Sequence, residues 1–146
     1  MLISDLLHDG ATPALEAMVR FSAGRQRLIA HNIANISTPN FQQQDVSPTE
    51  FQAQLRRAIE EWRNKGRTGP LRIQNSGQVE QLEDGSLTLR PGTRGVSRNV
   101  LFHDRNNRNI EQLMADQAEN LAVFRVASDL LRSRHETLRA AIAERV

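Results

Sequence analysis

The sequence predicts a mainly α-helical fold in which long N- and C-terminal helices pack as a coiled-coil-like pair. A shorter second helix and a loop region rich in Gly and Arg complete the fold. Three observations carry this prediction: apolar residues recur at steps of three and four near both ends of the chain, a Ser-Pro-Thr-Glu capping sequence introduces a helix between them, and the stretch that follows lacks helical periodicity.

The first helix is expected from Thr12 to about Asn35. Thr12 is suited to cap it, and Pro13 suits the first helical position, where its missing N–H costs no hydrogen bond. The predicted inner stripe alternates steps of four and three and includes two polar residues, Ser22 and Gln26. Its apolar members are Leu15, Val19, Ile29 and Ile33.

The second helix is expected over 47–66. Ser47-Pro48-Thr49-Glu50 forms a capping box with proline at the first helical position. The apolar residues that then recur on one face are Phe51, Leu55, Ile59 and Trp62. This face predicts a helix that is buried on one side and solvated on the other.

The segment 67–108 is rich in Gly, Asn, Ser and Arg, and we expect it to be a flexible or partner-ordered loop. Residues 78–82 and 86–90 flank Glu83-Asp84-Gly85, and Asp-Gly suits a tight turn, so a small β-hairpin can form there. Two strands alone are only marginally stable.

The last helix, expected from Ile110 to Ile142, has the strongest periodicity in the chain. Its stripe alternates steps of four and three without a slip, and such a helix is about 50 Å long. The predicted seam residues on it are Ile110, Met114, Gln117, Leu121, Phe124, Leu131, Leu138 and Ile142. Gln117, with Ser128 and His135 in the same stripe, is expected to fix the register by hydrogen bonding, together with Asn32 and Asn35 of the first helix.

The chain therefore divides into four segments: 1–46 with the first helix and its exit, 47–66 with the second helix, 67–108 with the loop, and 109–146 with the last helix. A length of 146 residues suits one domain, and 38% hydrophobic content allows only a modest core. The net charge is +2, and no cysteine is present, which excludes disulfide and thiol chemistry. We expect no membrane insertion and no cleaved signal peptide, because no apolar run is long enough.

The histidines and glycines do not form a recognisable catalytic pattern. His135-Glu136 resembles the start of a zinc-protease helix, but Arg139 stands where the second histidine is required. There is no Gly-rich phosphate loop and no Gly-x-Ser-x-Gly elbow. We therefore expect no enzyme activity, no metal and no cofactor.

Arginines cluster in the loop and open an alternative. These residues are Arg90, Arg94, Arg98, Arg105 and Arg108. They could contact nucleic-acid phosphates, but aromatic residues for base stacking are nearly absent from that segment. Acidic surfaces on neighbouring protein subunits are the preferred interpretation, and no nucleic-acid partner is expected.

Residues 32–41, at the end of the first predicted helix, form an Asn-rich exit. Asn side chains bond to nearby backbone groups and tolerate a left-handed φ, while Pro39 pushes the residue before it toward an extended conformation. The chain should therefore leave the helix in one defined direction. The motif residues are Asn32, Ala34, Asn35, Thr38, Pro39, Asn40 and Phe41.

This exit resembles the Ala-Asn-Asn-x-Ala-Asn-x-x-Thr-Pro-Gly-Tyr signature near the N-terminus of bacterial flagellar axial proteins, the rod, hook and hook-associated subunits. His31, Asn40 and Phe41 stand where Asn, Gly and Tyr are usual. The opening 2–7 and the stretch 25–30 resemble proximal-rod members of that family. Residues 104–114 resemble the family's entry into its last helix, with Arg105 and Arg108 departing from it.

The resemblance implies a structural subunit of the proximal rod that assembles through its terminal helices and transmits torque between the MS ring and the distal rod. It implies type III export without a cleaved signal, and a periplasmic site in the basal body. The implied partners are other copies of the chain, the rod proteins FlgC, FlgF and FliE, and the MS ring or export gate. FlgC itself stays an alternative assignment, and a cytoplasmic helical adaptor or chaperone is the alternative from another functional class.

Overall fold

The computed structural model describes residues 11–67, 69–93 and 110–143, and these residues are mainly helical. The elements, in chain order, are α2 (Thr12–Ala34), β1 (Gln44–Asp45), α3 (Pro48–Asn64), β2 (Val79–Gln81), β3 (Leu87–Leu89), β4 (Gly92–Thr93) and α4 (Ile110–Ala143). None of the helices in these ranges is both long and apolar enough to span a membrane. The mainly α fold predicted from the sequence is confirmed.

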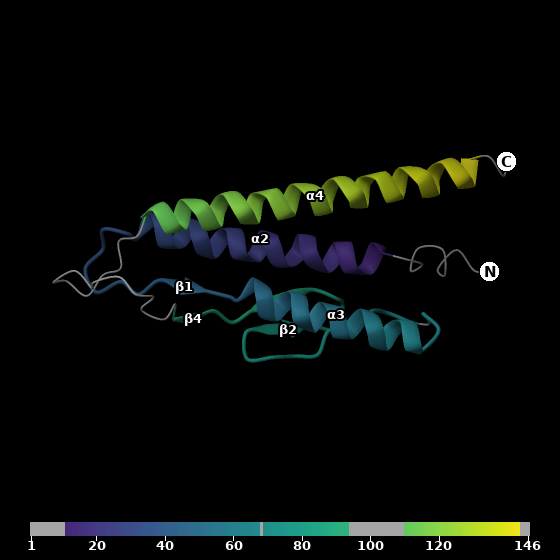
Figure 1. The fold of residues 1–146 in the computed structure, drawn as a ribbon, viewed down its shortest axis with the longest axis horizontal. Coiled ribbons are helices and arrows are strands. Elements are labelled where there is room, and N and C mark those ends of the chain that lie inside the picture. Colours follow the sequence, from purple (N-terminus) through teal and green to yellow (C-terminus); the bar gives the residue numbers. More distant parts are fainter. Residues whose placement is uncertain (1–10, 68, 94–109, 144–146) are drawn as a thin grey trace.

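The long helices α2 and α4 lie side by side (Figure 1) and share the most extensive contact between elements. They run antiparallel, because Asn120 of α4 meets Ser22 of α2 while His135 lies across a cavity from Thr12. With 34 residues against 23, α4 extends beyond the start of α2. The predicted pair of long terminal helices is therefore confirmed.

The residues predicted to cap the first and second helices, Thr12 and Ser47, have different outcomes. Ser47 caps α3 as expected, since its side chain accepts a hydrogen bond from the Glu50 backbone N–H at 3.2 Å. The expected cap at Thr12 is wrong: Ala11 occupies the N-cap position without a side-chain cap bond, and Thr12 is the buried first helical residue. Pro13 lies in the first turn, where its missing N–H is tolerated.

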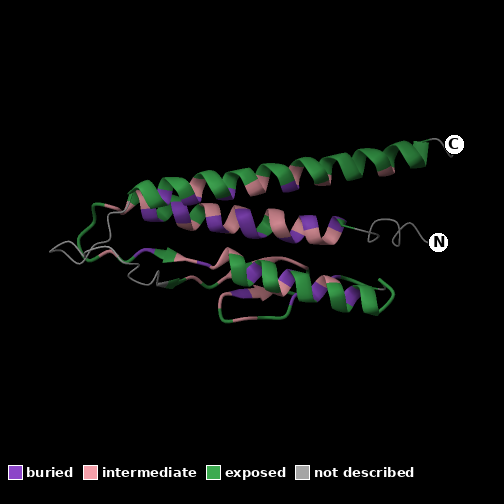
Figure 2. Ribbon diagram, in the orientation of Figure 1, coloured by how far each residue is buried: buried purple, intermediate pink, exposed green. Residues whose placement is uncertain are grey.

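The main apolar core lies between α3, α2 and the strands, on the side of α2 away from α4 (Figure 2). At its centre the rings of Phe21 and Phe51 stack with centroids 3.9 Å apart. Trp62 is buried and its indole N–H donates to the Gly69 carbonyl at 2.9 Å. The buried members of this cluster, called the α3 core below, are Ala17, Phe21, Val46, Phe51, Leu55, Ala58, Trp62, Leu71, Ile73 and Val79.

The predicted β-hairpin is present, as β2 paired antiparallel with β3 in the register Val79↔Leu89. At its turn Gly85 has φ +79°, and the Asp84 carboxylate accepts hydrogen bonds from the Ser86 N–H and hydroxyl. A second pair, β1 with β4, joins the segment after α2 to the segment after the hairpin. The prediction that segment 67–108 is flexible or becomes ordered only with a partner stays a prediction. Residues 94–109 lie outside the described part.

Candidate assembly surface and the Asn-rich exit

The motif residue Asn32 ties α2 to the chain that leaves it. Its side chain is 1% exposed, and its amide pairs with the backbone of Gln44 in both directions. The Asn32 Nδ2 donates to the Gln44 carbonyl at 2.7 Å, and the Gln44 N–H donates to the Asn32 Oδ1 at 3.0 Å. A single side chain thus takes the place of a neighbouring strand and holds β1 against the helix.

The rest of the exit is a compact turn on the surface. The Asn35 N–H and Nδ2 both donate to the His31 carbonyl, at 3.1 and 2.9 Å, which ends α2. The Thr38 N–H then donates to the Asn35 carbonyl, and the Phe41 N–H to the Thr38 carbonyl. These bonds account for the defined direction of the exit.

Two departures from the family signature are accommodated by this turn. Asn40 has φ +58°, so the expected left-handed position is confirmed. The Phe41 ring packs edge-on against His31, with centroids 5.5 Å apart. Ala34, Thr38 and Pro39 are exposed, and the Thr38 hydroxyl donates to the Asn35 Oδ1 at 3.4 Å.

Arg25, which the sequence reasoning did not single out, is the polar centre of the molecule. It is 4% exposed, and its Nε and Nη2 donate to the two Asp45 carboxylate oxygens at 3.0 and 2.9 Å. Burial alone would lower the pKa of the Arg25 guanidinium. The hydrogen bonds and charge of Asp45, with the charges of Asp116 and Glu119, outweigh burial and raise that pKa.

The contact between α2 and α4, called the helix seam below, combines buried polar residues with apolar ones. The Asn120 Nδ2 donates to the Ser22 carbonyl at 2.9 Å and to the Gln26 Oε1 at 3.0 Å. The buried α4 residues are Leu113, Asp116, Asn120 and Ala127. These four residues follow one another at steps of three, four and seven, which is a helical spacing. Because two of them are polar, a search for apolar periodicity does not find this face.

The structure divides the predicted seam residues into two groups. Buried or half-buried residues are Leu15, Val19, Ile29, Ile33, Gln117, Phe124, Leu131 and Leu138. Ile110, Met114, Leu121 and Ile142 are instead exposed, Met114 by 50%. Polar Ser128 is half-buried, while His135 is exposed. The role of these residues in assembly stays a prediction.

Three of the exposed residues, Ile110, Met114 and Leu121, form what is called the outer row below. Steps of four and seven keep them on one side of α4, next to the face that contacts α2. A row of large apolar side chains beside an internal contact is typical of a surface that binds protein. The outer row is the candidate assembly surface.

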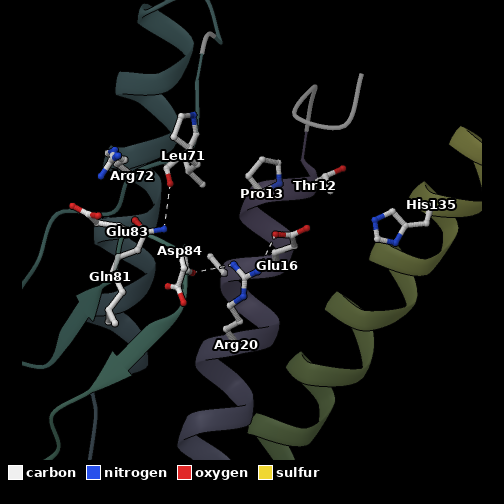
Figure 3. Close-up of a pocket in the computed structure, with 14 residues that line it drawn as sticks. Thr12, Pro13, Glu16, Arg20, Leu71, Arg72, Gln81, Glu83, Asp84 and His135 are labelled. Carbon is white, nitrogen blue, oxygen red and sulfur yellow. Dashed lines mark hydrogen bonds and ion pairs between the residues drawn. The ribbon is translucent and has the colours of Figure 1, made fainter. Parts of the chain in front are cut away.

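A cavity of about 340 Å³ opens between α2, the hairpin turn and α4 (Figure 3). Across it Arg20 of α2 donates to the Gly85 carbonyl at 3.0 Å, and His135 lies on the α4 side. Within α2, Arg20 also pairs with Glu16 at 3.2 Å. No group of three His, Cys, Asp or Glu residues in the described ranges could hold a metal ion. The contacts in the cavity brace the hairpin turn against α2.

The sequence of the chain is similar to those of flagellar rod proteins. No protein-family model matches the chain. The chain is 30% identical to the flagellar basal body rod protein FlgB of Borrelia hermsii over 106 residues. The matched region covers 73% of the chain and 76% of that protein. It is 36% identical over 58 residues to the protein of the same name from Yersinia enterocolitica, 40% of each. The chain therefore belongs to the FlgB family of flagellar basal body rod proteins.

Proposed function

We propose that the chain is a structural, non-enzymatic subunit of the proximal flagellar rod that assembles through the outer row of α4. The observation that supports this most is the exposure of Ile110, Met114 and Leu121 along one side of a long terminal helix. Family membership supports the same role, since both relatives are named as rod proteins.

The composition of the helix seam explains why assembly would matter. Burying a large apolar side chain stabilises a fold by about 1.5–3 kcal/mol, while ordering a residue costs about 1–2 kcal/mol. Over its 34 residues α4 fully buries only two apolar side chains, Leu113 and Ala127, and half-buries Val123, Phe124, Leu131 and Leu138. Neighbouring subunits would bury the apolar side chains that α4 leaves exposed, so folding and assembly would be coupled.

The proposed setting is the one that the family resemblance implies. The chain leaves the cytoplasm by type III export without a cleaved signal and joins the rod in the periplasm. Its partners there are other copies of itself, the rod proteins FlgC, FlgF and FliE, and the MS ring or export gate. In that position it transmits torque from the MS ring to the distal rod.

Leu121→Asp tests the assembly surface. A charge in the outer row should abolish rod assembly, because a carboxylate cannot be buried unpaired at an apolar contact. Swimming in soft agar and recovery of the chain in detergent-extracted basal bodies are the measurements. Ala122→Asp is the matched control, since Ala122 is exposed on the same helix but outside the outer row.

Normal motility of the Leu121→Asp strain would contradict the role of the outer row. Fractionation of the wild-type chain separates the other functional classes. A helical adaptor or chaperone would use the same row for a partner helix but stay in the cytoplasm. A nucleic-acid binder would lose affinity steeply with salt and would be absent from basal bodies.

A further inference from the structure

The last two turns of α4 extend past the start of α2. The two helices are antiparallel, and the Asn120 side chain bonds to both Ser22 and Gln26. Counted from that contact at an equal rise per residue, the first residue of α2, Thr12, falls opposite residues 130–134 of α4. The rest of α4 therefore has no part of α2 beside it.

Residues 136–143 form this end of the helix and are called the α4 tail below. Figure 1 shows the α4 tail projecting beyond α2, and Figure 2 shows it largely exposed. Among the described elements only α2 makes an extensive contact with α4. The α4 tail is thus the part of the helix that α2 leaves uncovered.

The α4 tail keeps the apolar line that faces α2 earlier in the helix. Leu138 comes eleven residues after the buried Ala127, which is close to three full turns, and Ile142 follows four residues later. Leu138 is half-buried and Ile142 is 53% exposed. The contact line of α4 therefore continues where α2 has ended.

Residues 2–9, which precede α2 in the chain, are complementary to the α4 tail in pattern and in charge. They contain two acids and no arginine or lysine, while residues 131–143 carry three arginines against one acid. Their apolar residues recur at a spacing that places them on one face of a helix. These residues are Leu2, Ile3, Leu6 and Leu7.

We propose that residues 2–9 dock as a helix on the α4 tail of the same molecule, antiparallel to it. Continuing the count from the contact between α2 and α4 brings Ile3 opposite Ile142 and Leu7 opposite Leu138. The two large apolar side chains of the α4 tail then each meet one from the docked helix.

The same count places Asp9 within reach of Arg134, which is exposed on α4. An ion pair there would fix the start of the docked helix. The inference goes beyond the proposed function, because it assigns the apolar end of α4 to the chain itself. The outer row is then the part of α4 that is left for neighbouring subunits.

A second apolar place near the start of α2 fits residues 2–9 less well. It is a hollow of about 180 Å³ beside Ala11, lined among others by Ile59, Trp62 and Arg63. A cavity of about 150 Å³ holds one benzene-sized group. The hollow can therefore take one large side chain, whereas residues 2–9 have four to bury.

Cross-linking of the purified full-length chain tests the docking, because the chain contains no cysteine. The double variant Ile3→Cys/Ile142→Cys is treated with a short bis-maleimide at low protein concentration. We expect a link within one molecule, found as joined tryptic peptides in the monomer band. Leu7→Cys/Leu138→Cys repeats the test at the other end of the docked helix, in case the first pair of changes lowers the helix content measured by circular dichroism.

A mixture of ¹⁵N-labelled and unlabelled protein separates a link within one molecule from a link between two. Joined peptides of mixed isotope content would mean that a second copy covers the α4 tail, and they would overturn the proposal. The absence of any link in both double variants would overturn it as well.

Ile3→Cys/Leu121→Cys is the matched control, since Leu121 is another exposed apolar site on α4, about 30 Å from Ile142. It should give no link within a molecule. Ile3→Cys/Arg63→Cys tests the hollow beside α3. A link to Leu121 or to Arg63 as efficient as the link to Ile142 would overturn the proposed site.

Charge exchange tests the ion pair in the Ile3→Cys/Ile142→Cys background. Arg134→Glu should lower the rate of linking about threefold, in keeping with the loss of one exposed ion pair. Asp9→Arg/Arg134→Glu restores opposite charges and should restore the rate. Arg125→Glu, at an exposed arginine nearer the middle of α4, is the control and should have no effect. Equal effects of the two arginine changes would refute the pairing.

The outcome is separable from that of the proposed function. The link is measured on the purified chain, while the rod assignment is decided by recovery of the chain in basal bodies. A chain that is recovered there without forming the link would keep its function and lose the docked helix.

Discussion

The two sides of α2 are packed in contrasting ways. Toward α3 and the hairpin, α2 contributes to the α3 core, where the buried rings of Phe21 and Phe51 stack. Toward α4, it meets the helix seam, where Ser22 and Arg25 are buried with Asn120 and Asp116. The difference teaches that this chain holds its middle part mainly by apolar packing, whereas it joins its last helix by a mixed contact in which buried polar groups are prominent.

Polar contacts fix geometry more than they stabilise. A satisfied hydrogen bond contributes about 0.5–1.5 kcal/mol net, less than a buried leucine or phenylalanine. The helix seam can therefore specify how α4 lies on α2 while leaving the outer row available to a neighbour. We expect substitutions in the two regions to separate stability from assembly.

The largest effect should come from Phe51→Ala in the α3 core. Removing a ring that is 2% exposed and stacked on Phe21 leaves a cavity and should lower the free energy of unfolding by about 4 kcal/mol. Denaturant unfolding followed by circular dichroism measures it. Leu121→Ala, at an exposed site, is the control and should change stability by less than about 0.5 kcal/mol. Equal losses in the two variants would break the contrast.

The next effect should come from the buried ion pair that joins α2 to β1. Arg25→Met leaves the Asp45 carboxylate without its cation and should cost about 3 kcal/mol. The double variant Arg25→Met/Asp45→Asn removes both charges and should recover part of that loss. Urea unfolding of the single and double variants gives the coupling. Additive losses would mean that the pair is not energetically linked.

A smaller effect should follow Gly24→Ala, where α2 meets the hairpin. A Cβ at position 24 would lie 2.5 Å from the Leu89 Cδ1, so the Leu89 side chain must shift. Overpacking costs about 1–3 kcal/mol and outweighs the gain of about 1 kcal/mol in helix propensity. The expected net loss is about 1 kcal/mol in thermal unfolding.

Leu89→Ala provides the control for the Gly24 contact. Truncating Leu89 opens the space that the new methyl group needs, so Gly24→Ala should become neutral or stabilising in the Leu89→Ala background. An unchanged loss in that background would place the cause in α2 itself rather than in its contact with β3.

The sequence predicted the elements better than the contacts between them. Local signals suffice for Ser47 at the start of α3, for the Asp84-Gly85 turn and for Asn40 with its positive φ, because neighbouring residues determine each of them. The face of α4 that meets α2 could not be read in this way. Apolar periodicity pointed to Met114 and Leu121, while long-range hydrogen bonds from Asn120 decide the face that is buried.

Arg25 illustrates the same limit at the level of one residue. An arginine in a helix is usually solvated, and its burial depends on Asp45, twenty positions later, and on acids of α4. Only the three-dimensional fold brings these charges together. The motif residue Asn32 is similar, since its partner is the backbone of Gln44, which has no sequence signature.

The smallest effect on stability is expected from a change in the hairpin turn, next to the α3 core. Hydrogen bonds from Ser86 lower the pKa of the Asp84 carboxyl, so this group contributes stability above its unfolded pKa and loses it as the pH falls through the folded value. Ser86→Ala should raise the Asp84 pKa toward its ordinary value, measured by NMR titration of the carboxyl carbon. Asp84 is fully exposed, so the melting temperature at neutral pH should change little.

Two results would contradict this expectation. An unchanged Asp84 pKa in the Ser86→Ala variant would show that Ser86 does not hold the turn. A large loss of stability at neutral pH would mean that the turn contributes to the α3 core.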